Sequence, residues 1–325
     1  VAINHSSRQK EFSIITQNID RMEQIDLNII RNRVQKVLDE KLQRTGLYYR
    51  IFSRTKSYHS IKAKLTKKAQ DYRAENKKMQ DIIGVRIIMY FFEDVGIIHE
   101  YLKHQSNYVD ESIDTPKANI FEPVRLNLIF RLPEDETKIL YDTLKFSPLS
   151  NQCELIDNTY EIQLRTVLSE GWHEVEHDLR YKFKEEKWWK YCCEDSRMLN
   201  GLYATLETSE RAMSHLFRSI AHKNYKNRDW SAMIRNHFCI KLSSFSLEKS
   251  FEDIFERKEE LPRQIFKISR NELIEKILLI PITFPLNMTN LILLTNRCFI
   301  HDEDLKALET SAQSQALDKI METLA

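Results

Sequence analysis

Glycine is scarce in this chain, with 5 residues in 325. Neither the Gly-x-x-x-x-Gly-Lys phosphate loop nor the Gly-x-Gly-x-x-Gly dinucleotide fingerprint occurs anywhere in it. Both motifs need glycine because the backbone must turn tightly and approach phosphate closely. The composition therefore argues against a Walker-type ATPase and against a Rossmann-fold dehydrogenase.

Cysteine is also sparse, and its spacing carries no metal or redox signature. The five cysteines include no Cys-x-x-Cys pair, and their number is odd: Cys153, Cys192, Cys193, Cys239 and Cys298. The first residues of the chain are polar and form no apolar leader. We therefore expect a cytoplasmic protein with reduced cysteines and no structural zinc site.

Long apolar runs are missing, with one exception. Residues 277–294 are largely apolar and approach the length of a membrane span. The run is interrupted by Pro281, Pro285, Asn287 and Asn290. Helix-breaking residues at this density favour two short buried elements, so no stable membrane association is expected.

What the chain does have is a globular composition with an uneven distribution of charge. It is 42% hydrophobic and 30% charged, and its length fits two domains or one domain with an appendage. The formal net charge is only +1, yet residues 41–90 contain 13 Lys or Arg against 3 Asp or Glu. A solvated helix face usually mixes both signs, so this excess indicates an anionic partner. A basic helix without any ligand is the alternative.

Hydrophobic patterning predicts an α+β core over residues 47–183. Apolar runs or alternation predict strands at residues 85–92, 107–113, 124–132 and 160–165. Helical spacing predicts helices at residues 8–45, 57–78, 94–104, 167–181 and 184–223, and onward to the last residue. Residues 134–158 are polar and irregular, which predicts loops and a hairpin. The core thus lies between an N-terminal helical segment, 1–46, and a mostly helical region, 184–325.

Two acids lie where strands can hold them rigidly. Asp81 stands immediately before the first apolar strand. Glu161 lies within a later strand, with Gln163 and Arg165 at period two on the same face. Acids on neighbouring strands can share Mg²⁺, or one can hold the metal while the other accepts a hydroxyl proton. For either acid alone, a surface charge on a strand is the alternative.

Cations occur in an order that suits a nucleotide. Lys56, Ser60 and Lys64 are spaced by four, so they share one helix face and form a row for successive phosphates. Arg54 and Arg86 each have a planar guanidinium that can stack on a purine. A lysine-rich exposed helix explains the same row without a ligand.

A His-Glu-x-x-His match occurs where His173 and Glu174 are followed by His177. On a helix this pattern binds zinc in metallopeptidases. Such an enzyme also needs a third ligand and a strand edge for its substrate, and it leaves the rest of the chain unexplained. A zinc peptidase is therefore the weaker interpretation.

Five ordered motifs together resemble the synthetase domain of the RelA/SpoT family, from about residue 47 to residue 182. They are Arg54-x-Lys56-Ser57-x-x-Ser60-x-x-x-Lys64, Asp81-Ile-Ile-Gly84-Val-Arg86-Ile, Pro116-Lys117-x-Asn119, Glu161-Ile-Gln163-Leu-Arg165-Thr166, and Trp172-x-Glu174-Val-Glu176-His177 followed by Tyr181-Lys182. The last motif accounts for the His-Glu-x-x-His match, because the family has Trp-x-x-Ile-Glu-His at this place. The resemblance implies a nucleotidyltransferase-like fold, a mixed β-sheet flanked by helices.

The resemblance also implies an enzyme of the GTP diphosphokinase type, which moves the β,γ-diphosphate of ATP to the 3′-hydroxyl of GDP or GTP and makes (p)ppGpp-type alarmones. Asp81 and Glu161 are the implied Mg²⁺ ligands, and Glu161 activates the acceptor hydroxyl. The implied ATP-binding residues are Arg54 and Arg86 for the adenine and Lys56, Ser60 and Lys64 for the phosphates, Lys64 also being catalytic. The implied acceptor-binding residues are Lys117, Asn119, Phe121, Arg125, Gln163, Arg165 and His177.

The acceptor loop departs from the family pattern. Where the family usually has Asn-Gly-Tyr-x-Ser-x-His, this chain has Asn119-Ile120-Phe121-Glu122-Pro123-Val124-Arg125. Phe121 can stack on a base but lacks the phenol, and Arg125 replaces a titratable imidazole with a fixed cation. The use of ATP is thus better supported than specificity for guanine.

Two alternatives follow from this departure. The same chemistry on another acceptor, the 3′ end of tRNA or an adenine nucleotide, would make the protein a growth-arresting toxin. A basic segment fits this alternative: Arg211, Arg218, Lys223, Lys226, Arg228 and Arg235. A non-catalytic nucleotide sensor is the second alternative. Because no hydrolase domain is recognisable, we expect a short, single-function synthetase, with homo-oligomers through helices as one expected form.

Overall fold

A computed structural model describes residues 26–74, 77–114, 124–181, 189 and 191–324. Its centre is a five-stranded β-sheet with the strand order β1-β2-β5-β4-β3. The strands are β1 (Tyr49–Thr55), β2 (Ile83–Met89), β3 (Tyr108–Ile113), β4 (Leu126–Arg131) and β5 (Thr159–Thr166). β2 and β5 are parallel, whereas the other neighbouring pairs are antiparallel. The predicted mixed sheet is confirmed.

The sheet has one apolar and one polar face, because residue types alternate along its central strands. In β5, buried Ile162 and Leu164 alternate with half-buried Glu161, Gln163 and Arg165. β2 follows the same alternation through residue 86 and is fully buried beyond it. The polar residues of both strands therefore lie on a single face.

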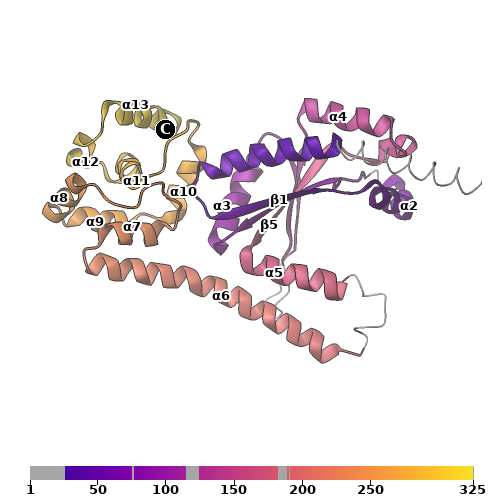
Figure 1. Cartoon of the computed structure of the whole chain (residues 1–325), viewed down its shortest axis with the longest axis horizontal. Coiled ribbons are helices and arrows are strands. Elements are labelled where there is room, and N and C mark those ends of the chain that lie inside the picture. The colour runs from indigo at the N-terminus through magenta and orange to yellow at the C-terminus, as the bar shows by residue number, and fades with distance from the viewer. Residues whose placement is uncertain (1–25, 75–76, 115–123, 182–188, 190, 325) are drawn as a thin grey trace, which may run out of the picture.

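Helices cover this sheet on both sides. They are a helix over residues 26–43, then α2 (Tyr58–Ala74), α3 (Phe92–Lys103), α4 (Glu134–Lys145) and α5 (Val167–Glu176). In Figure 1 the helix over residues 26–43 and α4 lie on one side of the sheet, and α5 lies on the other. α5 is fixed to the end of β5 by a capping box, in which Thr166 Oγ1 accepts from the Ser169 backbone N–H at 3.2 Å and Ser169 Oγ accepts from the Thr166 N–H at 3.1 Å.

The C-terminal region is helical, as predicted. α6 (Cys193–Lys226) runs alongside α5 and continues to a group of shorter helices (Figure 1). These are α7 (Trp230–Phe238), α8 (Lys249–Arg257), α9 (Glu260–Lys267), α10 (Arg270–Leu279), α11 (Met288–Thr295), α12 (Glu303–Ala307) and α13 (Ser311–Leu324). They pack around buried apolar side chains such as Phe255, Ile274 and Leu291.

The apolar run at residues 277–294 is divided, as predicted, between two elements. α10 ends at Leu279 and α11 begins at Met288, with an irregular segment between them. Within the described ranges no helix is both long and apolar enough to span a bilayer.

A buried ion pair joins the C-terminal helices to α3. Asp94, in the first turn of α3, is fully buried, and Arg270 of α10 donates from Nη2 to its Oδ2 at 3.1 Å. Arg270 Nε also donates to the carbonyl oxygen of Phe238 at 2.8 Å. Removing either partner of a buried pair leaves an uncompensated charge, so this contact ties α10 to α3.

Residues 134–158 contradict the prediction of loops and a hairpin. They form α4 and a 3₁₀ helix, Ser150–Leu155. α4 is polar on most of its surface, but Leu140 and Leu144, four residues apart, are buried. The three acidic residues in its first turn stabilise the helix, because negative charge is favourable at the positive N-terminal end of the helix dipole. A single narrow apolar stripe was therefore enough to form the helix.

The edge strand β1 was not predicted, and Arg54 lies on it. Half-buried and exposed residues alternate along this strand, so neither an apolar run nor a clear apolar alternation marks it. Of the other predictions, the helix expected from residue 184 begins at Cys193. Residues 8–25 and 184–188 lie outside the described ones.

Gly46, which lies in the turn after the helix over residues 26–43, has φ +69°. A Cβ atom there would lie 2.9 Å from the carbonyl oxygen of Lys241, whose N–H donates to Gly46 O at 2.6 Å. We expect Gly46→Ala to lower the free energy of unfolding by about 2 kcal/mol, from left-handed strain and this clash. Gly96→Ala in α3, where an added Cβ meets nothing within 4 Å, should instead stabilise. Urea unfolding of both variants checks this, and equal midpoints would contradict it.

Candidate active site

The polar face of the sheet opens into a cavity of about 210 Å³. In the β-ladders Gly84 is paired with Arg54 of β1 on one side and with Glu161 of β5 on the other. Paired residues of a sheet point to the same face, which brings these positions together. The cavity is lined by six of the predicted site residues: Arg54, Lys56, Asp81, Arg86, Glu161 and Gln163.

Asp81 is held between the two lysines that were predicted to bind phosphate. Lys64 Nζ donates to Oδ1 at 2.9 Å and to Oδ2 at 2.8 Å, and Lys56 Nζ also donates to Oδ2. Partial burial by itself would raise the pKa of Asp81, but the hydrogen bonds from Lys56 and Lys64 hold that pKa below its ordinary value. The carboxylate is therefore ionised at neutral pH.

The pKa values of the two lysines shift in opposite directions. Burial lowers the pKa of Lys56 although Asp81 acts in the opposite direction. For Lys64 burial also favours the neutral form, but Asp81 outweighs it and the pKa rises. Both lysines contact the carboxylate of Asp81 and can be shared between it and an incoming anion.

The start of α2 presents the remaining member of the predicted phosphate row. Ser57 caps the helix, because its Oγ accepts from the Ser60 N–H at 3.3 Å. The Lys56 N–H donates to Ile82 O at 2.8 Å, which fixes the helix start against the segment before β2. Ser60 is exposed on the first turn of α2, and its Oγ lies 2.9 Å from the Oγ of Ser57. Ser60 and Lys64 lie beside the cavity rather than lining it.

Among the described residues, the donors that bind Glu161 are both neutral. Its Oε1 accepts from Asn127 Nδ2 at 2.8 Å, and its Oε2 accepts from Gln163 Nε2 at 3.0 Å. It forms no ion pair with any residue of the described ranges. Glu161 therefore differs sharply from Asp81, whose oxygens face two cations.

Asn127 is the one residue of this group that the sequence interpretation missed. It lies on β4, opposite Gln163 in the antiparallel β4–β5 ladder. The signal was present: Asn127 is a polar residue between Leu126 and Leu128 in an otherwise apolar strand. Its importance emerges only once β4 is known to be the neighbour of β5.

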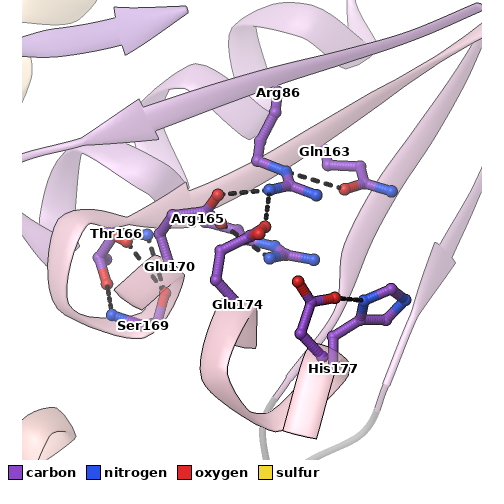
Figure 2. Close-up of polar contacts among 9 residues, drawn as sticks. Arg86, Gln163, Arg165, Thr166, Ser169, Glu170, Glu174 and His177 are labelled. Atoms are coloured by element: carbon purple, nitrogen blue, oxygen red, sulfur yellow. Dashed lines mark hydrogen bonds and ion pairs between the residues drawn. The ribbon is translucent and has the colours of Figure 1, made fainter. Parts of the chain in front are cut away.

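Arg86 connects the sheet to α5 (Figure 2). Its Nε donates to Gln163 Oε1 at 3.3 Å, and its Nη1 contacts the carboxylates of Glu170 and Glu174, one helical turn apart on α5. Arg165 Nη1 donates to the second oxygen of Glu170 at 2.7 Å. The predicted acceptor residues Gln163 and Arg165 thus belong to one network with Arg86.

Arg54 lies across the cavity from this network. It is exposed, and its side chain makes no hydrogen bond or ion pair to another described residue. Arg54 and Arg86 lie on adjacent strands and on one face of the sheet: Arg54 is opposite Gly84, which has no side chain, and Arg86 is two residues further along β2. This arrangement is compatible with the predicted binding of a flat base by both arginines.

Some of the residues predicted to bind the acceptor lie within the described part of the chain, and others do not. Lys117, Asn119 and Phe121 lie outside the described residues. Arg125 is exposed, and its Nε donates to Asp114 Oδ2 at 2.9 Å. His177 follows α5, with its Nδ1 3.0 Å from Asp178 Oδ1 (Figure 2). Neither of these two lines the cavity, so their acceptor roles stay predictions.

His173, the other histidine of the His-Glu-x-x-His match, is 8% exposed. Its ring packs against Trp172 and Tyr203, with centroid distances of 5.6 and 6.5 Å. Burial, together with the nearby charges of Arg165, Arg86 and Arg125, lowers its pKa to about 4. His173 is therefore a neutral packing residue at physiological pH.

This shift makes stability depend on pH. The unfolded chain binds a proton on His173 near pH 6.5, whereas the folded chain does so near pH 4, so stability falls as the pH decreases through this window. From pH 7.5 to 5 we expect a loss of roughly 1 to 2 kcal/mol from this residue, allowing for partial screening. Urea unfolding of His173→Gln and His173→Leu should show the smaller pH slope in both. A slope equal to that of the unmodified protein would contradict this assignment.

The donor set of the cavity fits Mg²⁺. Asp81 and Glu161 supply hard carboxylate oxygens to one cavity. Mg²⁺ is commonly held by one or two carboxylates together with substrate phosphates and water. Two acids are therefore sufficient, although no cluster of three or more His, Cys, Asp or Glu suited to a metal occurs in the described part of the chain.

Comparison with known proteins identifies the region that carries this cavity. A family model described as "Region found in RelA / SpoT proteins" matches residues 53–186. GTP pyrophosphokinase YwaC of Bacillus subtilis (strain 168) is 31% identical over 140 residues, which are 41% of this chain and 59% of that protein.

Solved structures of small alarmone synthetases 1 and 2 from Bacillus subtilis are also similar to this chain. They are 21% and 20% identical, with TM-scores of 0.39 and 0.41. The matches cover 58% and 62% of this chain and 92% and 96% of theirs. The residues matched by the family model, 53–186, include all the described lining residues of the cavity except Phe52.

Proposed function

We propose that this protein transfers the β,γ-diphosphate of ATP to the 3′-hydroxyl of a guanine nucleotide, GDP or GTP. The observation that carries the proposal is the meeting of Asp81 and Glu161 at one cavity that Lys56, Arg54 and Arg86 also line. Phosphoryl-type transfer depends mainly on positioning and charge neutralisation, and this cavity offers cations, a pair of acids and planar groups for a base.

Different residues bind the donor, ATP, and activate the acceptor hydroxyl. Arg54 and Arg86 hold the adenine of ATP, while Lys56 and Lys64 exchange part of their contact with Asp81 for phosphate oxygens. Glu161 accepts the proton of the 3′-hydroxyl. A bond forms between the 3′-oxygen and the β-phosphorus, the bond from that phosphorus to the α,β-bridging oxygen breaks, and AMP leaves. Mg²⁺, held by Asp81 and Glu161, would neutralise charge on the transferred diphosphate.

The choice of acceptor is tested directly with ATP labelled in its γ-phosphate. The protein is incubated separately with GDP, GTP, ADP and tRNA, and the products are separated and counted. We expect label in GDP and GTP. Label in tRNA or ADP alone would contradict the guanine acceptor, and no transfer to any of them would contradict the enzyme itself.

The basic segment that suggested tRNA is partly engaged within the protein. Arg228 donates to Glu256 at 2.9 Å, Arg211 pairs with Glu207 at 3.2 Å, and the guanidinium of Arg235 lies 4.8 Å from the ring of Phe245. These contacts leave fewer free cations for phosphate contacts than the sequence alone suggests. They therefore support the nucleotide acceptor over tRNA.

A further inference from the structure

The two acids of the cavity have opposite surroundings, although both were predicted to bind metal. Asp81 faces two ammonium groups, whereas both oxygens of Glu161 face amide N–H₂ groups. An amide donor orients a carboxylate without cancelling its charge. Glu161 is therefore fixed in direction, and each oxygen keeps a lone pair for another partner.

The strand register explains how Asn127 supplies one of these donors. The residue directly opposite Glu161 on β4 is Ile129, which has no polar atom in its side chain. Asn127, two residues away on the same face, reaches Glu161 diagonally across the ladder. Arg131 lies on the other side of Ile129 on this face, but in the described structure the hydrogen bond from β4 to the carboxylate comes from Asn127.

The second donor is itself oriented by a neighbour. Arg86 donates to Gln163 Oε1, so the Nε2 of Gln163 is directed to Glu161 (Figure 2 shows the Arg86–Gln163 contact). A chain of hydrogen bonds thus runs from Arg86 through Gln163 to Glu161 and ends at Asn127. Asn127 is the only member of this chain outside the motifs identified in the sequence.

We propose that Asn127 is a positioning residue for Glu161, holding its Oε1 so that the carboxylate faces the acceptor hydroxyl. This proposal rests on the proposed function. A carboxylate free to rotate spends less time in the reactive direction, so the loss is expected in kcat rather than in the binding of ATP.

The test compares two variants of similar size in the full-length protein, using transfer of labelled diphosphate from ATP to GDP. Asn127→Leu removes the donor, and we expect kcat to fall about 10- to 100-fold while KM for ATP stays within about threefold. Asn127→Asp puts a second carboxylate beside Glu161. We expect the acid limb of its kcat–pH profile to move up by about one unit or more, because like charges disfavour ionisation. The other charged groups facing Glu161 across the cavity, Asp81, Lys56 and Arg86, are unchanged in both.

Ser112→Ala provides the matched control. Ser112 is paired with Asn127 in the β3–β4 ladder, but its side-chain hydroxyl makes no hydrogen bond to another described residue, so kcat and the pH profile should be unchanged. Combining Asn127→Leu with Glu161→Gln should cost no more than Glu161→Gln alone. If Asn127→Leu is too unstable to assay, the pH profile of Asn127→Asp decides.

Different results would overturn the proposed function and the positioning role of Asn127. An unmodified protein that transfers no diphosphate overturns the proposed function. An active protein in which Asn127→Leu keeps the full kcat, or in which Asn127→Asp keeps the original pH profile, overturns only the positioning role.

Discussion

Replacing Glu161 with glutamine is expected to lower kcat for diphosphate transfer by about 10³-fold. The amide has nearly the same size but can neither accept the proton of the 3′-hydroxyl nor offer an anionic oxygen to Mg²⁺. Glu161 has no ion pair in the described structure, so the substitution leaves no cation without its partner. Binding of ATP, which we propose depends on Arg54, Arg86 and the lysines, should change by less than about tenfold. Rates with labelled ATP and GDP, together with ATP titration, measure the two effects separately.

Glu154→Gln is the matched control for the loss of one negative charge. Glu154 is an exposed carboxylate, 3.8 Å from Arg73 and 70% accessible. Its substitution should leave both rate and binding unchanged. A Glu161→Gln protein with full activity would identify another residue as the base. If neither the unmodified protein nor this variant transfers diphosphate but both bind ATP, the nucleotide sensor becomes the better interpretation.

The convergence of Asp81 and Glu161 could be predicted because each acid is attached to an apolar run that is typical of a buried strand. The residue types around them were also predictable, since phosphate, metal and base binding each call for particular side chains. The residues that contact the two acids from other strands could not be predicted. β5 lies between β2 and β4 in the sheet, although it is the last of the five strands in sequence order. This position brings Asn127 of β4 to Glu161 of β5. Strand order depends on long-range packing that a local pattern does not contain.

The missing elements have a similar explanation. β1 is an edge strand whose half-buried positions include Ser53 and Thr55, so it lacks the apolar signal of a central strand. α4 buries only one narrow stripe. The lysines illustrate the limit for side chains: Lys56 and Lys64 were assigned to phosphate from their spacing, and that spacing could not show that both also reach Asp81. Their contact depends on the long-range packing that places Asp81, which precedes β2, beside the first turns of α2.

Filling the space at Gly84 is expected to have the second-largest effect. This glycine lies between Arg54 and Glu161 in the sheet and lines the cavity. A Cβ added there would lie 4.0 Å from Arg54 Cγ, an ordinary contact. Gly84→Ala should therefore fold and keep activity within about threefold. The longer side chain of Gly84→Leu would extend into the space between the two arginines, where the proposed base lies.

For Gly84→Leu we expect the affinity for ATP and kcat/KM to fall by about 10²-fold or more, with little change in the free energy of unfolding because the side chain enters a cavity rather than the core. Gly96→Leu, at a position of α3 where an added Cβ meets nothing within 4 Å, tests the same substitution away from the site and should bind ATP normally. ATP titration and urea unfolding of the three variants supply the measurements. Unchanged ATP affinity in Gly84→Leu would show that the nucleotide does not occupy the space between Arg54 and Arg86, and the donor half of the site would then have to be placed elsewhere on the polar face.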